Sequence, residues 1–138
     1  MFRKILLPVD LTDKHGPALT AAAELAAAAK GSITLLHVIE AITGTSWQEE
    51  KDFYGRLQKA AKSHLAHLAR GLPPGVPCQA EILIGKRAAE VVRFARDNGT
   101  DLIVLTAPRF DPAHPEAGWA SLSHKISFLA PCPVLLVQ

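Results

Sequence analysis

Cysteine is scarce in this chain, which contains two cysteines among 138 residues. Cys78 and Cys132 lie far apart, and neither has another cysteine or a histidine nearby at zinc-ligand spacing. Neither a disulfide framework nor a structural zinc site is therefore expected. We expect two buried, reduced thiols, as in a cytosolic protein.

Long hydrophobic runs are also missing. The most apolar stretches are rich in alanine and interrupted by Glu24 and Lys30, and they fall well short of the ~20 residues that cross a bilayer. The N-terminal apolar run is cut short by Pro8 and Asp10, and no small-residue cleavage site follows it. We therefore expect a strand at this end of the chain, with no membrane segment and no export signal.

A strong excess of charge of one sign is lacking too. The formal net charge is +2, and the 15 basic residues are interleaved with the 13 acidic ones. Proteins that bind nucleic acid usually gather Lys and Arg on one face or stripe. This pattern argues against DNA or RNA as a partner.

The chain does contain a regular alternation of strand and helix patterns. Its 138 residues show no break in composition, so we expect one domain over residues 1–138. Apolar β-rich runs predict strands, and apolar periodicity of three to four residues bounded by Gly or Pro predicts helices. The predicted strands are 3–9, 33–39, 80–84, 101–106 and 134–137, and the predicted helices are 17–30, 53–72, 88–97 and 121–129.

Strict alternation of apolar strands and helices predicts an α/β fold, a doubly wound parallel sheet with helices on both faces. The alanine-rich helix 17–30 is expected to lie close to the sheet, and Gly31 to stop it. The proline-rich segment 107–120 is predicted to be the longest loop. The expected inner face of the second helix consists of Phe53, Leu57, Ala61, Leu65, Leu68 and Leu72.

Five segments, in this order, resemble the successive signatures of the universal stress protein family, across nearly the whole chain. They are 3–10 (RKILLPVD), 35–38 (LLHV), 85–92 (Gly85 followed by AAEVV at 88–92), 101–104 (DLIV) and 130–137 (APCPVLLV). The resemblance implies a five-stranded sheet in the order 3-2-1-4-5, of the adenine-nucleotide alpha-hydrolase-like type. It also implies a ligand crevice at the switch point between the first and fourth strands, as is general for open α/β sheets.

The resemblance further implies a set of nucleotide-contacting positions. In ATP-binding members, an Asp ending the first strand and the backbone near the end of the second hold the adenosine, and Asp10 and Val38 match these positions. Asp10 also fits a plain turn acceptor, and both interpretations stay open. The full candidate crevice comprises Pro8, Val9, Asp10, Val38, Thr106, Arg109, Ala120, Ser121 and Ser123.

The phosphate end of this candidate crevice departs from the family pattern. Those members carry Gly-x-x-Gly after the fourth strand and a later Gly-Ser or Gly-Thr, but here Thr106, Arg109 and Ala120 stand at the three glycine positions. Side chains there obstruct backbone approach to phosphate, and Pro108, Pro112 and Pro115 remove N–H donors. Gly118 is displaced from the expected position, whereas Arg109 is itself a potential bidentate phosphate donor. We expect ATP binding to be impaired.

Other polar residues have more ordinary interpretations. Ser121 is typical of an N-cap for the last helix, and Ser123 would face the crevice or solvent. Asp13 and His15 follow the first strand, close enough to suggest acid/base chemistry, but without an oxyanion-hole signature we interpret them as polar loop residues. His64 and His67 are three residues apart with no third ligand, so we expect a solvated helix face and no metal.

Two nucleotide-binding motifs and one signalling architecture do not fit. The loop after the first strand has a single glycine, so it lacks Gly-x-Gly-x-x-Gly, and no phosphate-binding loop with Lys and Ser or Thr occurs. A phosphoacceptor receiver would need an Asp after the third strand, where Gly85 stands.

The function that we expect is that of a cytosolic, non-catalytic stress-response protein of this family, acting by dimerisation and partner binding. The alternative is an adenine-nucleotide (ATP or AMP) sensor, with or without slow hydrolysis. The uncharged strand 134–137 would lie at a sheet edge, so we expect a homodimer joined through Val134, Leu135, Leu136 and Val137.

Overall fold

The computed structural model describes residues 1–41, 47–108, 111–114 and 121–138. Within them the chain alternates strictly between strands and helices, as predicted. The elements are β1 (Lys4–Pro8), α1 (Gly16–Ala29), β2 (Ser32–Glu40), α2 (Trp47–Arg70), β3 (Cys78–Gly85), α3 (Arg87–Asp97), β4 (Leu102–Thr106), α4 (Leu122–Leu129) and β5 (Val134–Val137).

All five strands form one parallel sheet in the order β3-β2-β1-β4-β5, which confirms the predicted topology. β1 lies in the middle, where Leu7 pairs with Leu35 of β2 and Leu6 pairs with Ile103 of β4. The chain moves from β1 to β3 on one side of β1 and then returns to β4 and β5 on the other. The direction of winding therefore reverses at β1, and the strand order has its switch point there.

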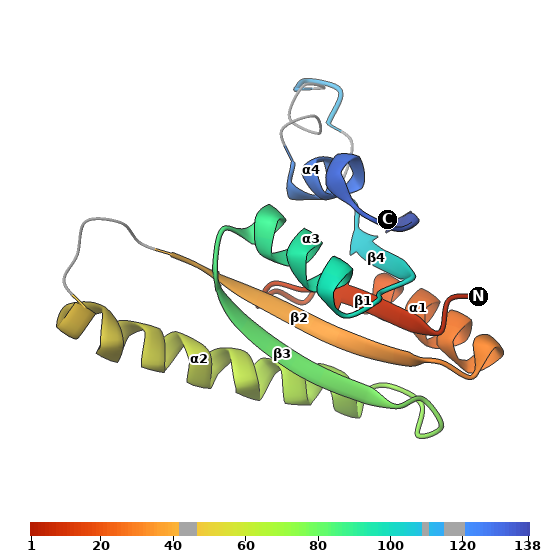
Figure 1. The fold of residues 1–138 in the computed structure, drawn as a ribbon, viewed down its shortest axis with the longest axis horizontal. Coiled ribbons are helices and arrows are strands. Elements are labelled where there is room, and N and C mark those ends of the chain that lie inside the picture. Colours follow the sequence, from red (N-terminus) through yellow and green to blue (C-terminus); the bar gives the residue numbers. More distant parts are fainter. Residues whose placement is uncertain (42–46, 109–110, 115–120) are drawn as a thin grey trace.

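Two apolar layers cover the sheet, because successive side chains of each strand point to opposite faces. On one face Ile5 and Leu7 pack with the buried alanines of α1 and with Leu65 of α2. On the other face Leu6 packs with α3 and α4. In Figure 1, α2 runs alongside β3, and α3 lies over β2.

The alanines of α1 confirm the expected close approach of this helix to the sheet, since Ala18, Ala22, Ala23 and Ala26 are all buried. The inner face of α2 differs at its N-terminal end, where Tyr54 is 7% exposed and Phe53 is 39% exposed. Tyr54 lies seven residues before Ala61, about two helical turns, whereas Phe53 is offset from that face by roughly 80°. The prediction of Phe53 as an inner residue was therefore wrong.

The two cysteines, both free, are only partly buried, whereas buried thiols were expected. Burial raises the pKa of Cys78, and burial together with the neighbouring Asp101 raises the pKa of Cys132. Both thiols therefore stay protonated at neutral pH. The thiolate is the form that attacks disulfides and binds metals, so neither thiol is activated for these reactions.

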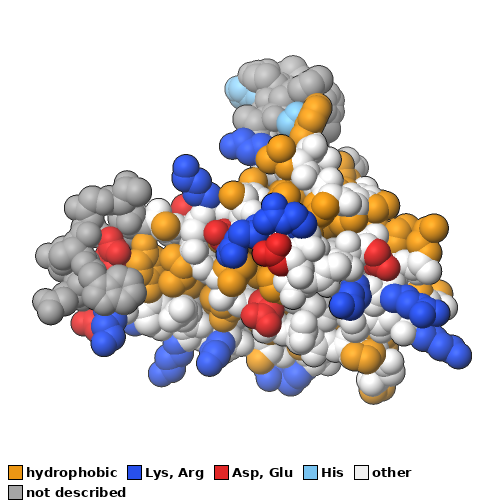
Figure 2. All heavy atoms as spheres, viewed as in Figure 1, with side chains coloured by type: hydrophobic (Ala, Val, Ile, Leu, Met, Phe, Trp, Pro, Cys, Tyr) orange, Lys and Arg blue, Asp and Glu red, His pale blue; other side chains and the backbone are white. Residues whose placement is uncertain are grey.

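The surface shows no separation of charge into one-sign regions on the face seen in Figure 2, where Lys and Arg side chains lie among Asp and Glu. None of the described helices is long and apolar enough to cross a membrane.

Candidate functional site

A crevice of about 220 Å³ opens at the carboxyl ends of β1, β2 and β4, at the switch point of the sheet. Seven residues of the candidate crevice line it, namely Pro8, Val9, Asp10, Val38, Thr106, Ser121 and Ser123. Arg109 and Ala120, the other two, lie outside the described residues, as do Pro115 and Gly118. The sequence thus placed residues from four separate segments at one sheet edge, where the structure brings them together.

Backbone hydrogen bonds and a histidine hold the ends of β1 and β2 together beneath the crevice. The Val9 amide donates to the carbonyl of Leu36 at 2.9 Å. His37 Nδ1–H donates to the Val9 carbonyl, also at 2.9 Å. Val38 and Val91 complete the apolar floor of the crevice, which lies beneath a polar rim.

Asp10 is the most strongly bonded acid of this rim. Its Oδ1 accepts hydrogen bonds from the amide and hydroxyl of Thr12 and from His15, and its Oδ2 pairs with Lys14 Nζ at 2.9 Å. Partial burial by itself would raise the pKa of this carboxyl. The bonds outweigh this burial and hold the pKa of Asp10 well below the usual carboxyl range. Asp10 is therefore a fixed negative charge, and with 41% of its side chain exposed it remains open to a ligand.

His15 corrects the interpretation of this loop, because it is buried, with 4% of its surface exposed. Its Nε2 lies 2.8 Å from Asp10 Oδ1 and its Nδ1 lies 2.7 Å from Thr106 Oγ1. The ring thus bridges the ends of β1 and β4 rather than lying in solvent. Asp13, by contrast, is an exposed loop residue as expected.

The N-terminus of α4 forms the opposite wall. Ser121 is the N-cap, as predicted, and its Oγ accepts a hydrogen bond from the His124 amide at 3.2 Å. Ser123 is buried against the crevice, and its Oγ lies 3.1 Å from that of Ser121. The expectation that Ser123 faces the crevice is thus met, and the alternative of a solvated side chain is not.

Two cationic side chains line the rim of the crevice but were not predicted from the sequence. Lys14 pairs with Asp10, and Arg87 at the start of α3 pairs with Glu40 through Nε and Oε2 at 2.9 Å. Both side chains are more than half exposed and both line the crevice. The sequence held one usable signal, since Arg87 follows the end of β3 and parallel strands present their carboxyl ends at one edge.

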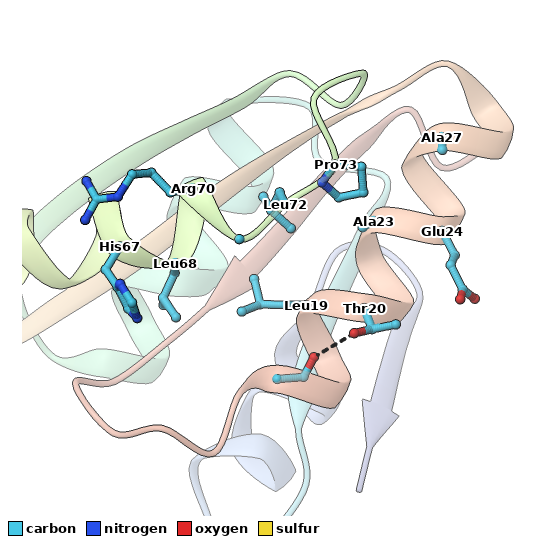
Figure 3. A pocket seen from close by; sticks show the side chains of 12 residues that line it. Leu19, Thr20, Ala23, Glu24, Ala27, His67, Leu68, Arg70, Leu72 and Pro73 are labelled. Carbon is cyan, nitrogen blue, oxygen red and sulfur yellow. Dashed lines mark hydrogen bonds between the residues drawn. The ribbon is translucent and has the colours of Figure 1, made fainter.

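A larger hollow of about 820 Å³ lies elsewhere, between α1 and the C-terminal end of α2. Figure 3 shows Leu19 of α1 directed toward Leu68 and Leu72, with Glu24 turned outward. The hydrogen bond drawn there, from Thr20 Oγ1 to the Gly16 carbonyl at 3.1 Å, is internal to α1. Its polar lining includes Thr20, which bonds within α1, and Glu24, which turns outward, and it lies away from the switch point, so we place the candidate site in the smaller crevice.

The histidine pair of α2 also differs from expectation. His64 and His67 have ring centroids 6.4 Å apart, and His67 is exposed. His64 is only partly exposed rather than fully solvated, and its Nε2 is buried without a hydrogen-bond partner in the described part of the chain. No group of three potential metal ligands was found among the described residues.

The lowered pKa of Asp10 predicts an acid-dependent contribution to stability. A carboxyl whose pKa is lower in the folded state stabilises the fold above its unfolded pKa, about 4, and loses this effect progressively as the pH falls below that value. We expect Asp10→Asn to be less stable than the wild type at about pH 7, and the difference to shrink toward about pH 3. Urea unfolding at several pH values measures this, with Asp13→Asn as the matched control. An unchanged difference across this range would contradict the assignment.

Comparison with known proteins places this geometry in context. The sequence model described as the universal stress protein family matches residues 1–138. The universal stress protein YxiE of Bacillus subtilis (strain 168) is 30% identical over 149 residues, which cover 100% of both chains. Among solved structures, hypothetical protein MJ0577 superposes with a TM-score of 0.82 at 23% identity, covering 99% of this chain and 96% of that one.

Two similar structures contain nucleotides. The universal stress protein from Archaeoglobus fulgidus in complex with dAMP has a TM-score of 0.64 at 18% identity, with 100% of both chains covered. A universal stress protein in complex with cAMP has a TM-score of 0.72 at 14% identity, covering 99% of this chain and 97% of that one. At these identities the similarity concerns the fold.

Proposed function

The chain belongs to the universal stress protein family, and from this premise we propose that it binds an adenine nucleoside or nucleoside monophosphate in the crevice at the switch point. In this proposal the bound state is signalled in the cytoplasm through a homodimer and its partners, without turnover of ATP. The observation that carries the proposal is Asp10, an ionised carboxylate that is half exposed at the rim and adjoins the apolar floor formed with Val38.

The chemistry of the crevice suits such a ligand. Adenine is a flat aromatic ring whose faces can pack on the apolar floor of Val38 and Val91, and a ribose presents hydroxyl donors to a carboxylate such as Asp10. Lys14 and Arg87 at the rim would attract a single phosphate. The volume of about 220 Å³ lies below the roughly 300–1,000 Å³ of pockets for drug-sized ligands, which favours a small nucleoside over ATP. The dAMP and cAMP complexes of similar proteins support the choice of an adenine monophosphate.

The test of this proposal removes the charge of Asp10 while keeping its shape. We expect Asp10→Asn to weaken binding of adenosine and AMP by about 10- to 100-fold, because a charge-assisted hydrogen bond contributes ~1.5–3 kcal/mol. Isothermal titration calorimetry measures the affinities. Asp13→Asn, on the same loop but exposed, is the control and should bind as the wild type does. No binding of either ligand to the wild type, or equal binding by Asp10→Asn, would overturn the proposal.

A dimer is favoured by the apolar edge of the sheet. β5 is the last strand of the sheet, and its Leu135 and Leu136 are 38% and 48% exposed. Phe128 and Leu129 of α4, just before β5, are 77% and 62% exposed. An unpaired strand edge with exposed leucines associates readily with another copy, and a two-fold arrangement would pair both edges.

Leu136→Lys is expected to convert the dimer into a monomer, because two such lysines would face each other across the two-fold axis. Size-exclusion chromatography with light scattering measures the mass. Leu11→Lys is the matched control, since Leu11 is also an exposed leucine, at 39%, but lies beside β2, on the other side of β1 from β5. A monomeric wild type at high concentration, or a variant that remains dimeric, would show that β5 is not the interface.

A further inference from the structure

The crevice contains a continuous relay of three side chains that nucleotide binding does not use in full. Thr106 at the end of β4, His15 before α1 and Asp10 after β1 are linked by contacts of 2.7 Å and 2.8 Å through the two ring nitrogens. His15 and Thr106 are 91 residues apart in the sequence. A hydroxyl, an imidazole and a carboxylate in this order have the connectivity of an activated nucleophile, a general base and an orienting acid.

The direction of the relay follows from the tautomer of His15. Nε2 lies 2.8 Å from the Asp10 carboxylate and 3.1 Å from the Asp10 amide, so it faces an acceptor and a donor. A bare Nε2 would leave its lone pair against an ionised carboxylate at the shorter distance. A protonated Nε2 instead forms a charge-assisted hydrogen bond, roughly twice as strong as a neutral one. We therefore assign the proton to Nε2, which leaves Nδ1 as the acceptor for the Thr106 hydroxyl.

The surroundings leave the nucleophile accessible and the base protected. His15 is buried, whereas Thr106 is partly exposed and lines the crevice. The hydroxyls of Ser121 and Ser123 and the ammonium of Lys14 line the same hollow, and they are donors that could stabilise an oxyanion. A small hollow over an apolar floor has room for a short acyl group beside Thr106.

We propose that Thr106, His15 and Asp10 form a triad that hydrolyses small activated carboxylic esters through an acyl-threonine intermediate. Thr106 Oγ1 attacks the ester carbonyl while its proton passes to His15 Nδ1, and the bond to the leaving alkoxide breaks as that proton is delivered to it. A water molecule then attacks the acyl-threonine, gives one proton to Nδ1, and Thr106 recovers its proton as the carboxylic acid leaves. Asp10 is a positioning residue throughout. The inference shares the crevice with the proposed nucleotide site but does not rest on it.

The experiment treats the full chain with para-nitrophenyl acetate, follows release of para-nitrophenolate, and locates the acetyl group by mass spectrometry of peptides. We expect one acetyl group on Thr106. Thr106→Val should abolish this mark, whereas Thr106→Ser should retain it. His15→Gln should slow acetylation by at least about 100-fold, the lower range for removal of a general base. Asp10→Asn should slow it as well and should move the Nε2 proton of His15, which nitrogen-15 NMR detects.

Two controls separate the triad from general reactivity and from loss of the fold. His67→Gln removes an exposed imidazole of α2 and should leave the rate unchanged. Circular dichroism of each variant shows whether it is folded, and Thr106→Ser keeps the test decisive if His15→Gln unfolds. An acetyl group on Lys or His side chains alone, equal marking of Thr106→Val, or a His15 proton on Nδ1 in the wild type would each overturn the proposal. Calorimetric titration of the wild type with adenosine involves no acetyl transfer, so a failure of one function is distinguishable from a failure of the other.

Discussion

The wild-type protein is expected to bind ATP no more tightly than AMP. The family's ATP-binding members approach the phosphates through three glycines, and Thr106, Arg109 and Ala120 replace them here. Thr106 carries a Cβ, and its hydroxyl is held by His15, while Pro108 lines the crevice without an N–H donor. Two lost charge-assisted hydrogen bonds at ~1.5–3 kcal/mol each would weaken ATP binding by a few orders of magnitude. The adenosine end, with Asp10, would remain.

Calorimetric titration of adenosine, AMP and magnesium-ATP measures how affinity depends on the number of phosphates. Arg109→Ala is the companion variant. It removes a guanidinium, which as a bidentate phosphate donor would otherwise restore part of the lost affinity for phosphate. Nearly equal affinities for AMP and ATP would support the expectation. Submicromolar ATP binding, much tighter than that of AMP and indifferent to Arg109→Ala, would show that backbone groups of the loop cradle phosphate despite its prolines.

Gly31→Ala is expected to destabilise the fold by about 3 kcal/mol, near the upper end of the range for overpacking. Gly31 lies between α1 and β2, and a Cβ there would meet three backbone atoms of Arg3 at 2.5, 2.6 and 2.8 Å. Backbone cannot move aside as a flexible side chain can. The Ser32 amide also donates to the Arg3 carbonyl at 2.8 Å, so any shift breaks the start of the β1–β2 pairing. Equilibrium urea unfolding measures the change.

Gly55→Ala is the matched control for Gly31→Ala. Gly55 lies within α2, and a Cβ there would meet nothing within 4 Å. Because alanine has the higher helix propensity, the same substitution should stabilise the protein by up to about 1 kcal/mol. Opposite signs for the two variants are the expected result. Equal and small effects would show that Arg3 gives way without cost.

Local patterns in the sequence predicted most of the fold. The strand 134–137 was predicted with the bounds found for β5, because Pro131 and Pro133 punctuate a short apolar run. β2 and β3 extend beyond their predicted limits by one to two residues at each end. These ends contain Ser32, Glu40 and Cys78, whose pairing depends on the neighbouring strand rather than on their own propensity.

Long-range contacts decided what the local patterns could not. Gly31 was expected to stop α1, and the helix ends just before it, but the residue in the left-handed conformation there is Lys30, with φ 54°. Gly31 is needed instead because the backbone of Arg3 passes so close to it. The sequence around residue 31 does not predict this contact with Arg3, because the contact depends on β1 and β2 lying side by side.

For the candidate site, too, the sequence determined one part and the tertiary structure decided the rest. The alternating pattern and the family resemblance determined that residues from the ends of β1, β2 and β4 and the start of α4 would meet, since parallel strands share one carboxyl edge. Only the tertiary structure decided that His15 is buried between Asp10 and Thr106. A histidine in a polar loop has no local periodicity that reveals its burial. Its environment depends on Thr106 of β4, 91 residues away in the sequence. This residue comes close to His15 only because β4 pairs with β1 in the folded sheet.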